Sequence, residues 1–160
     1  MEKKIMSTWG IGPAYVGIIT LCTVVAMIPV VREKVQIDLP GFLRTFMLVF
    51  GIFLIVIGVH IWMQAALKSK LHDNIRAGKL VKDGVYAYVR NPIYSAFMLV
   101  QWGIIMVSAN PLIAIAIPLY WILMTVMVKA TEEKWLLEAY GDHYIIYCMK
   151  VNRCIPWIKK

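Results

Sequence analysis

Two groups of polar side chains lie at the ends of a long uncharged run in this sequence. The first group surrounds an arginine and comprises Tyr86, Tyr88, Arg90, Asn91 and Tyr94. The second group is a pair of adjacent carboxylates, Glu132 and Glu133. A guanidinium group can hold a carboxylate through two hydrogen bonds, and carboxylates near apolar surroundings are costly without a cationic partner. The first group could therefore bind an anionic part of a ligand, and the second a cationic part.

Each group also has a structural explanation. An arginine at the end of a membrane helix can extend its side chain to lipid phosphate. Carboxylates at the start of a helix interact favourably with the helix dipole. Arg90 could also pair with the glutamates directly, which would make the whole cluster structural. The sequence leaves these alternatives open.

The run between the two groups, residues 91–128, contains no charged side chain. As a helix, its 38 residues would cross the ~30 Å hydrocarbon core of a bilayer roughly twice. Pro111 follows a short polar step near the middle of the run, which favours a turn there. The run therefore predicts a hairpin of two membrane helices, residues 93–109 and 111–128, that returns both polar groups to one face of the membrane.

Two further uncharged stretches, residues 13–31 and 45–67, are long enough to cross a bilayer. Hydrophobic residues make up 61% of the 160 residues, too many for an ordinary soluble domain of this size. Beyond residue 131, apolar and charged residues alternate at helical spacing on both sides of Gly141, which predicts two short amphipathic helices. The predicted fold is all-α: one integral membrane domain over residues 1–160, with four transmembrane helices and a cytoplasmic C-terminal helical cap.

The distribution of lysine and arginine sets the predicted orientation. With four crossings, 14 of the 17 basic residues lie on the side of both termini, and only Arg32, Lys34 and Arg44 lie on the other. The positive-inside rule then makes both termini and the polar groups cytoplasmic. The net charge of +8 suits a bilayer with anionic lipids, whereas nucleic acid is a poor alternative partner because the basic residues flank helices. No metal site is predicted, since no cysteine–histidine cluster has ligand spacing.

The polar groups form part of an ordered set of motifs. The set contains Gly84-x-Tyr86-x-x-x-Arg90-Asn-Pro92-x-Tyr94, the hairpin, Glu132-Glu133-x-x-Leu136, Tyr140-Gly141-x-x-Tyr144-x-x-Tyr147 and Ile155-Pro156. In order and spacing it resembles the isoprenylcysteine carboxyl methyltransferase family and, more distantly, the phospholipid N-methyltransferases. The resemblance covers about residues 80–158, and the N-terminal half matches only in being hydrophobic.

The resemblance implies a membrane enzyme that transfers a methyl group from S-adenosylmethionine to a lipophilic or small membrane-partitioning acceptor. The acceptor could be a prenylcysteine carboxylate, a lipid amine or a small thiol. By position, the implied catalytic residues are Arg90, Glu132 and Lys129. The implied cofactor-binding residues are Tyr86, Arg90, Asn91, Pro92, Tyr94, Glu132, Glu133, Tyr144 and Tyr147. Carboxylates and aromatic faces suit the sulfonium and amino groups of this cofactor.

Three positions depart from the family pattern. Asn91 stands where histidine is common, Ala96 where glycine is frequent, and Lys129 where the family has an arginine that is tied to catalysis. Two other classes of protein stay open, a membrane reductase related to sterol-reducing enzymes and a small four-helix transporter. The sequence has no Gly-rich phosphate loop after a strand, which argues against the reductase. It has no Asp or Glu inside a predicted span, where a proton-coupled transporter would need one.

Overall fold

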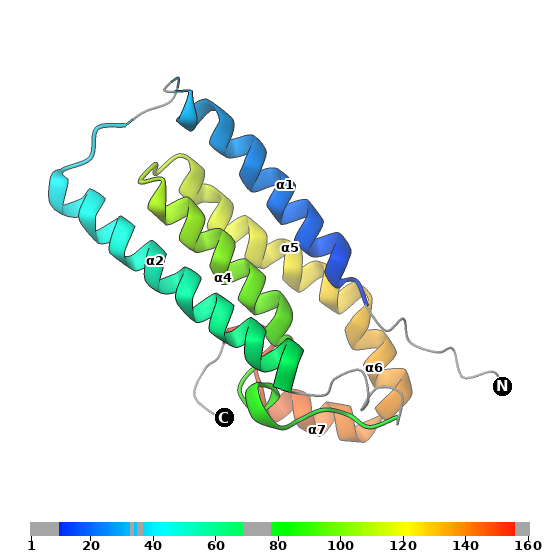
Figure 1. The fold of residues 1–160 in the computed structure, drawn as a ribbon. Coiled ribbons are helices and arrows are strands. Elements are labelled where there is room, and N and C mark those ends of the chain that lie inside the picture. The colour runs from blue at the N-terminus through cyan, green and yellow to red at the C-terminus, as the bar shows by residue number, and fades with distance from the viewer. Residues whose placement is uncertain (1–9, 33, 35–36, 69–77, 156–160) are drawn as a thin grey trace.

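Four helices run side by side in an elongated bundle, and two short helices lie at one end of it (Figure 1). The computed structural model describes residues 10–32, 34, 37–68 and 78–155. Within these ranges the α-helices are α1 (Gly12–Val31), α2 (Gly41–Met63), α4 (Pro92–Val107), α5 (Ala116–Ala130), α6 (Glu132–Tyr140) and α7 (Asp142–Lys150). The described residues form no strand, and the all-α prediction is confirmed for them.

Short irregular helices join or extend the main ones. A π-helical turn, η1 (Gln64–Lys68), continues α2, and 3₁₀ turns, η2 (Gly84–Ala87) and η3 (Ile113–Ile115), precede α4 and α5. α2 begins at Gly41, before the predicted start at residue 45, because its first turn tolerates Arg44 with the side chain exposed. The predicted turn of the hairpin is confirmed: Ala109 has a φ of 49°, and the Leu112 N–H donates to Asn110 Oδ1 at 3.0 Å.

Three apolar segments are long enough to cross a membrane, Gly12–Val31, Gly41–Leu67 and Ile113–Tyr140. The fourth predicted span forms α4, whose 16 residues reach about 24 Å against a hydrocarbon core of ~30 Å. α4 contacts α1, α2 and α5, so much of its surface meets protein. Length and composition therefore identify three spanning segments among the described residues, and not the predicted four.

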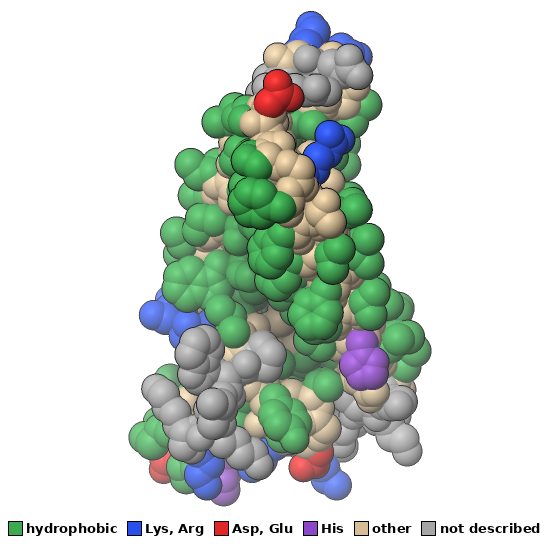
Figure 2. Space-filling view, turned by 90° about the vertical axis from the view of Figure 1, so that its left-hand side faces the viewer, with side chains coloured by type: hydrophobic (Ala, Val, Ile, Leu, Met, Phe, Trp, Pro, Cys, Tyr) green, Lys and Arg blue, Asp and Glu red, His purple; other side chains and the backbone are tan. Residues whose placement is uncertain are grey.

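Large apolar side chains cover the outside of the bundle. Figure 2 shows a hydrophobic band with charged side chains toward both ends. On α2 alone, Phe42, Phe46, Phe53 and Val56 are each more than half exposed. An apolar surface of this extent would be unfavourable in water and is typical of contact with lipid. The protein is therefore a membrane protein.

Small residues let α2 and α4 pack closely. A Cβ atom added at Gly51 would lie 2.7 Å from the carbonyl oxygen of Gly103, and one added at Gly58 would lie 2.8 Å from that of Ala96. Such short separations leave no room for a side chain, so the two backbones approach directly. Ala96, one of the three departures from the family pattern, thus lies on the contact between α2 and α4.

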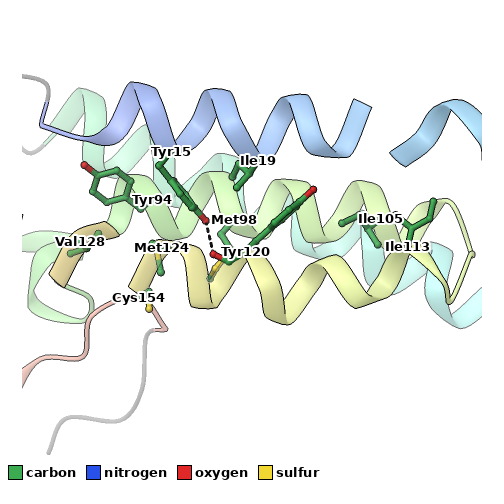
Figure 3. Packing of buried hydrophobic residues seen from close by; sticks show 10 residues of the cluster. All are labelled: Tyr15, Ile19, Tyr94, Met98, Ile105, Ile113, Tyr120, Met124, Val128 and Cys154. Atoms are coloured by element: carbon green, nitrogen blue, oxygen red, sulfur yellow. Dashed lines mark hydrogen bonds between the residues drawn. The ribbon is translucent and has the colours of Figure 1, made fainter. Parts of the chain in front are cut away.

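The core lies between α1, α4 and α5 (Figure 3). Tyr15 and Ile19 of α1 pack there with Met98 of α4 and Met124 of α5. The Tyr15 hydroxyl donates to the backbone carbonyl of Tyr120 at 3.3 Å. The cluster extends through Tyr94, Val128 and Cys154 to the end of the bundle that carries α6 and α7. The two polar groups identified in the sequence therefore lie next to the hydrophobic core.

Candidate active site

The start of α4 is held in place by the segment that follows α7. Pro92 occupies the first turn of α4, where a proline lacks only an N–H that would have no helical partner. The backbone N–H groups of Arg90 and Asn91 donate to the carbonyls of Asn152 and Arg153 at 2.8 and 3.0 Å. The Asn91 side-chain amide also donates to the Arg153 carbonyl at 3.0 Å. Asn91, where the family commonly has histidine, therefore ties the C-terminal segment to the start of α4.

Glu133 is paired with two arginines from different parts of the chain. Arg153 Nε and Nη2 donate to its two carboxylate oxygens at 2.7 and 3.0 Å, and Arg90 Nη1 lies 3.1 Å from Oε1. The hydrogen bond to Glu133 raises the pKa of Arg153 above its ordinary value. Arg90 and Glu133 are largely buried, with side chains 8% and 18% exposed. In the structure it is Arg153 that holds a carboxylate by two hydrogen bonds. Arg90 pairs with Glu133, as expected if the cluster has a structural role.

Arg90 also contacts α7. Its Nη1 donates to the Tyr144 hydroxyl at 3.1 Å and to Cys148 Sγ at 2.5 Å, and its guanidinium carbon lies 5.8 Å from the centre of the Tyr144 ring. The Nε atom is buried and has no hydrogen-bond partner among the described residues. Because an unpaired buried donor costs about 1–3 kcal/mol, an acceptor that reached this atom would be bound favourably.

Two tyrosines of α7 cover the cluster at this end of the bundle. Tyr144 and Tyr147 are 4% and 6% exposed, and the Tyr147 hydroxyl donates to the carbonyl of Tyr86 at 2.5 Å. Burial raises the pKa of both phenols above the ordinary value, and the nearby Arg90 opposes the shift. Both side chains therefore stay neutral at physiological pH and offer aromatic surface and a hydroxyl without a charge.

Glu132, the neighbour of Glu133, has different partners. Its Oε1 accepts hydrogen bonds from the Tyr94 hydroxyl and, at 2.9 Å, from the backbone N–H of Ile11. Both donors are neutral, and no cationic side chain of the described residues forms an ion pair with Glu132. Its Oε2 makes no hydrogen bond within the described part of the chain. Glu132 is thus a partly buried carboxylate without a cationic partner in the described part of the chain.

The structure brings the predicted cofactor-binding residues together at one end of the bundle, from η2, the start of α4, the start of α6, and α7. Lys129 differs from them. It lies in the last turn of α5 with an exposed side chain, and it forms no hydrogen bond or ion pair with another described residue. Its charge acts on Glu133 without a direct contact, and the catalytic role of Lys129 stays a prediction.

Sequence reasoning missed three members of the site: Arg153, Cys148 and Ile11. In the sequence, Arg153 is one of several basic residues near the C-terminus, and Ile11 lies just before the first apolar stretch. Neither a motif nor periodicity marks them, because Ile11 acts through its backbone and Arg153 meets its partner through the path of the chain. The only available signal was electrostatic, since a buried carboxylate pair needs cationic partners somewhere in the chain.

The helical bundle, its apolar outer surface and the cluster of charged and aromatic side chains at one end define a helical membrane protein. The sequence profile of the phospholipid methyltransferase family matches residues 46–143. The chain belongs to this family. The match begins earlier than residue 80 and includes most of α2, so the N-terminal half carries more of the family pattern than its hydrophobicity alone.

Named methyltransferases are similar to about half of the chain. Methanethiol S-methyltransferase 1 of Bradyrhizobium diazoefficiens is 33% identical over 73 residues, which are 46% of this chain and 25% of that protein. Protein-S-isoprenylcysteine O-methyltransferase B of Arabidopsis thaliana is 32% identical over 81 residues, 50% of this chain and 41% of that protein. The Schizosaccharomyces pombe protein-S-isoprenylcysteine O-methyltransferase is 38% identical over 80 residues, 49% and 34% of the two chains. These relatives confirm the resemblance to the isoprenylcysteine methyltransferases.

The matched part of the chain spans between a quarter and about two fifths of the length of these relatives. No solved structure matches the chain significantly.

Proposed function

We propose that this chain transfers the methyl group of S-adenosylmethionine to an acceptor that partitions into the membrane. Membership of the phospholipid methyltransferase family supports the reaction type, and so do the names of the relatives. The observation that carries the site assignment is the cluster at the end of the bundle, where the start of α4, α6 and α7 meet.

The residues present fit the charges of this cofactor. The amino-acid part of S-adenosylmethionine has a carboxylate and an ammonium group, and its sulfur is a positive sulfonium. Arg90 Nε is a buried donor without an acceptor among the described residues, which suits the carboxylate. Glu132, which has no ion-pair partner among the residues that the structure describes, suits a positive group, because an opposite charge makes a partly buried carboxylate less costly.

When bound, the cofactor would supply an electrophilic methyl carbon, to which the acceptor forms a bond as the bond to sulfur breaks. The residues of the chain would orient and enclose it. Arg90 and Glu132 would hold opposite charges, and Tyr94 and Tyr144 would add aromatic surface near the cation. Tyr86, Asn91, Pro92, Glu133 and Tyr147 would shape the site and hold Arg90 in place. Helices α6 and α7 would exclude water from it.

The acceptor would reach the site from the bilayer. The family and the relatives suggest a lipid amine, a prenylcysteine carboxylate or a small thiol, which all partition into or near the membrane. We further propose that α4 is a fourth crossing within one domain of residues 1–160. Both termini and the site would then face the cytoplasm, in agreement with the distribution of basic residues. Family membership favours methyl transfer over the reductase and the transporter.

The test is a calorimetric titration of the detergent-purified protein with S-adenosylmethionine, run beside Glu132→Gln. We expect saturable binding by the wild type and a loss of affinity of at least about tenfold in the variant, because one charge-assisted interaction is removed. Glu138→Gln is the matched control, since Glu138 is an exposed carboxylate of the same helix.

Two outcomes would contradict the proposal. The first is the absence of binding by a wild-type sample that unfolds cooperatively on heating, which would lead to a titration with NADPH as the test of a reductase. The second is an equal affinity of Glu132→Gln and Glu138→Gln, which would remove Glu132 from the site.

A further inference from the structure

The beginning of α1 lies against the candidate site, although it is distant from it in the sequence. The backbone N–H of Ile11 donates to Glu132 Oε1 at 2.9 Å, across a separation of 121 residues. α1 lies outside the range that matches the family profile, residues 46–143. The family match therefore assigns no role to this end of α1.

The contact is close enough to require glycine on the side of α1. Gly10 has a φ of +55°, a conformation that favours glycine, and a Cβ atom added there would overlap the Glu132 carboxylate. A Cβ atom added at Gly12 would lie 3.2 Å from Tyr94 Cε1. The chain passes so near Glu132 and Tyr94 that a side chain at position 10 would displace the carboxylate.

The two hydrogen bonds of Glu132 are both made by one of its carboxylate oxygens. Ile11 N–H and the Tyr94 hydroxyl both donate to Oε1, whereas Oε2 has no partner among the described residues. Two hydrogen bonds to the same oxygen fix the orientation of the carboxylate, because rotation about the Cγ–Cδ bond would break both of them.

We infer that the turn leading into α1, Gly10–Gly12, is a positioning element of the cofactor site: it holds Glu132 so that Oε2 faces the positive charge of the cofactor. This inference rests on the proposed function, in which Glu132 binds that charge. Ile11 acts through its backbone N–H, and Gly10 acts by the absence of a side chain.

A double-mutant cycle tests the inference, with the affinity for S-adenosylmethionine and the melting temperature as measurements. Ile11→Pro removes the N–H, and Ile11→Ala keeps it as the control. We expect Ile11→Pro to bind about tenfold more weakly than Ile11→Ala, as for the loss of one hydrogen bond to a charged group, so that the loss of the side chain itself is accounted for. In a Glu132→Ala background Ile11→Pro should cause no further loss, since it acts only through the carboxylate.

A second pair of variants, without proline, tests whether the effect of Ile11→Pro comes only from a local distortion of the backbone. Gly10→Ala should weaken binding to a similar extent, whereas Gly17→Ala, where a Cβ atom would meet nothing within 4 Å, should not. Wild-type affinity in both Ile11→Pro and Gly10→Ala would overturn the inference alone. A full loss in the Glu132→Ala background, or a loss matched by a lower melting temperature, would show a purely structural role. Failure of the wild type to bind would overturn the proposed function as well.

Discussion

The two glutamates at the start of α6 are neighbours in the sequence with opposite surroundings. Glu133 faces the C-terminal segment and is held by Arg153 and Arg90. Glu132 faces the beginning of α1, and its hydrogen bonds with the described residues come from neutral donors. Consecutive residues of an α-helix point about 100° apart, so one turn of helix can serve two separate environments. Glu133 thus links two distant segments of the chain, whereas Glu132 keeps one carboxylate oxygen without a hydrogen bond to the described residues.

The largest effect expected from this comparison is on stability. Glu133→Gln leaves Arg90 and Arg153 without their counter-charge in a largely buried position, so we expect the free energy of unfolding to fall by about 3 kcal/mol. The measurement is thermal unfolding in detergent. Glu132→Gln should lower the melting temperature much less, and an equal loss in the two variants would abolish the distinction between them.

A smaller loss of stability is expected from Arg153→Lys. Lysine keeps the charge but cannot make the two-point contact with Glu133, so we expect a loss of about 1–2 kcal/mol. Arg32→Lys, at an exposed position of the sequence beyond α1, is the control and should unfold as the wild type does. If Arg153→Lys is as stable as this control, the positive charge alone holds Glu133, and the second hydrogen bond of Arg153 adds no stability.

On the side of Glu132, the expected effect is on ligand affinity. Tyr94→Phe removes the hydroxyl that donates to Glu132 and keeps the aromatic ring. We expect the affinity for S-adenosylmethionine to fall about fivefold, the equivalent of about 1 kcal/mol for one hydrogen bond. Tyr88→Phe changes an exposed tyrosine of the same segment and serves as the control. Equal affinities in the two variants would separate the Tyr94 hydroxyl from ligand binding.

The smallest effect is expected at Lys129. Its side chain is exposed and makes no ion pair with the described residues, so Lys129→Gln should change the affinity for S-adenosylmethionine by less than about twofold. The same titration with Glu132→Gln provides the scale. A tenfold loss at Lys129 would show that this residue belongs to the site, as its position in the motif suggests.

Much of the fold could be predicted because membrane helices depend on local composition. The apolar runs at residues 13–31 and 45–67 became α1 and α2, the turn near Pro111 separates α4 from η3 and α5, and Gly141 separates α6 from α7. The helix α4 was predicted as well, but its crossing of the membrane does not follow from its length and composition. Composition indicates that a segment is apolar, but a helix that packs on several neighbours can be shorter than the bilayer is thick.

The sequence by itself determined which residues could form the site, since motif and spacing marked Arg90, Tyr94, Glu132 and Glu133. Only the tertiary structure decided which partners each of these residues contacts. It brought Arg153 to Glu133 and the Ile11 N–H to Glu132, over separations of 20 and 121 residues. The physical reason is that a hydrogen bond depends on distance in space, and the path of the chain between its two partners is set by the packing of the whole bundle.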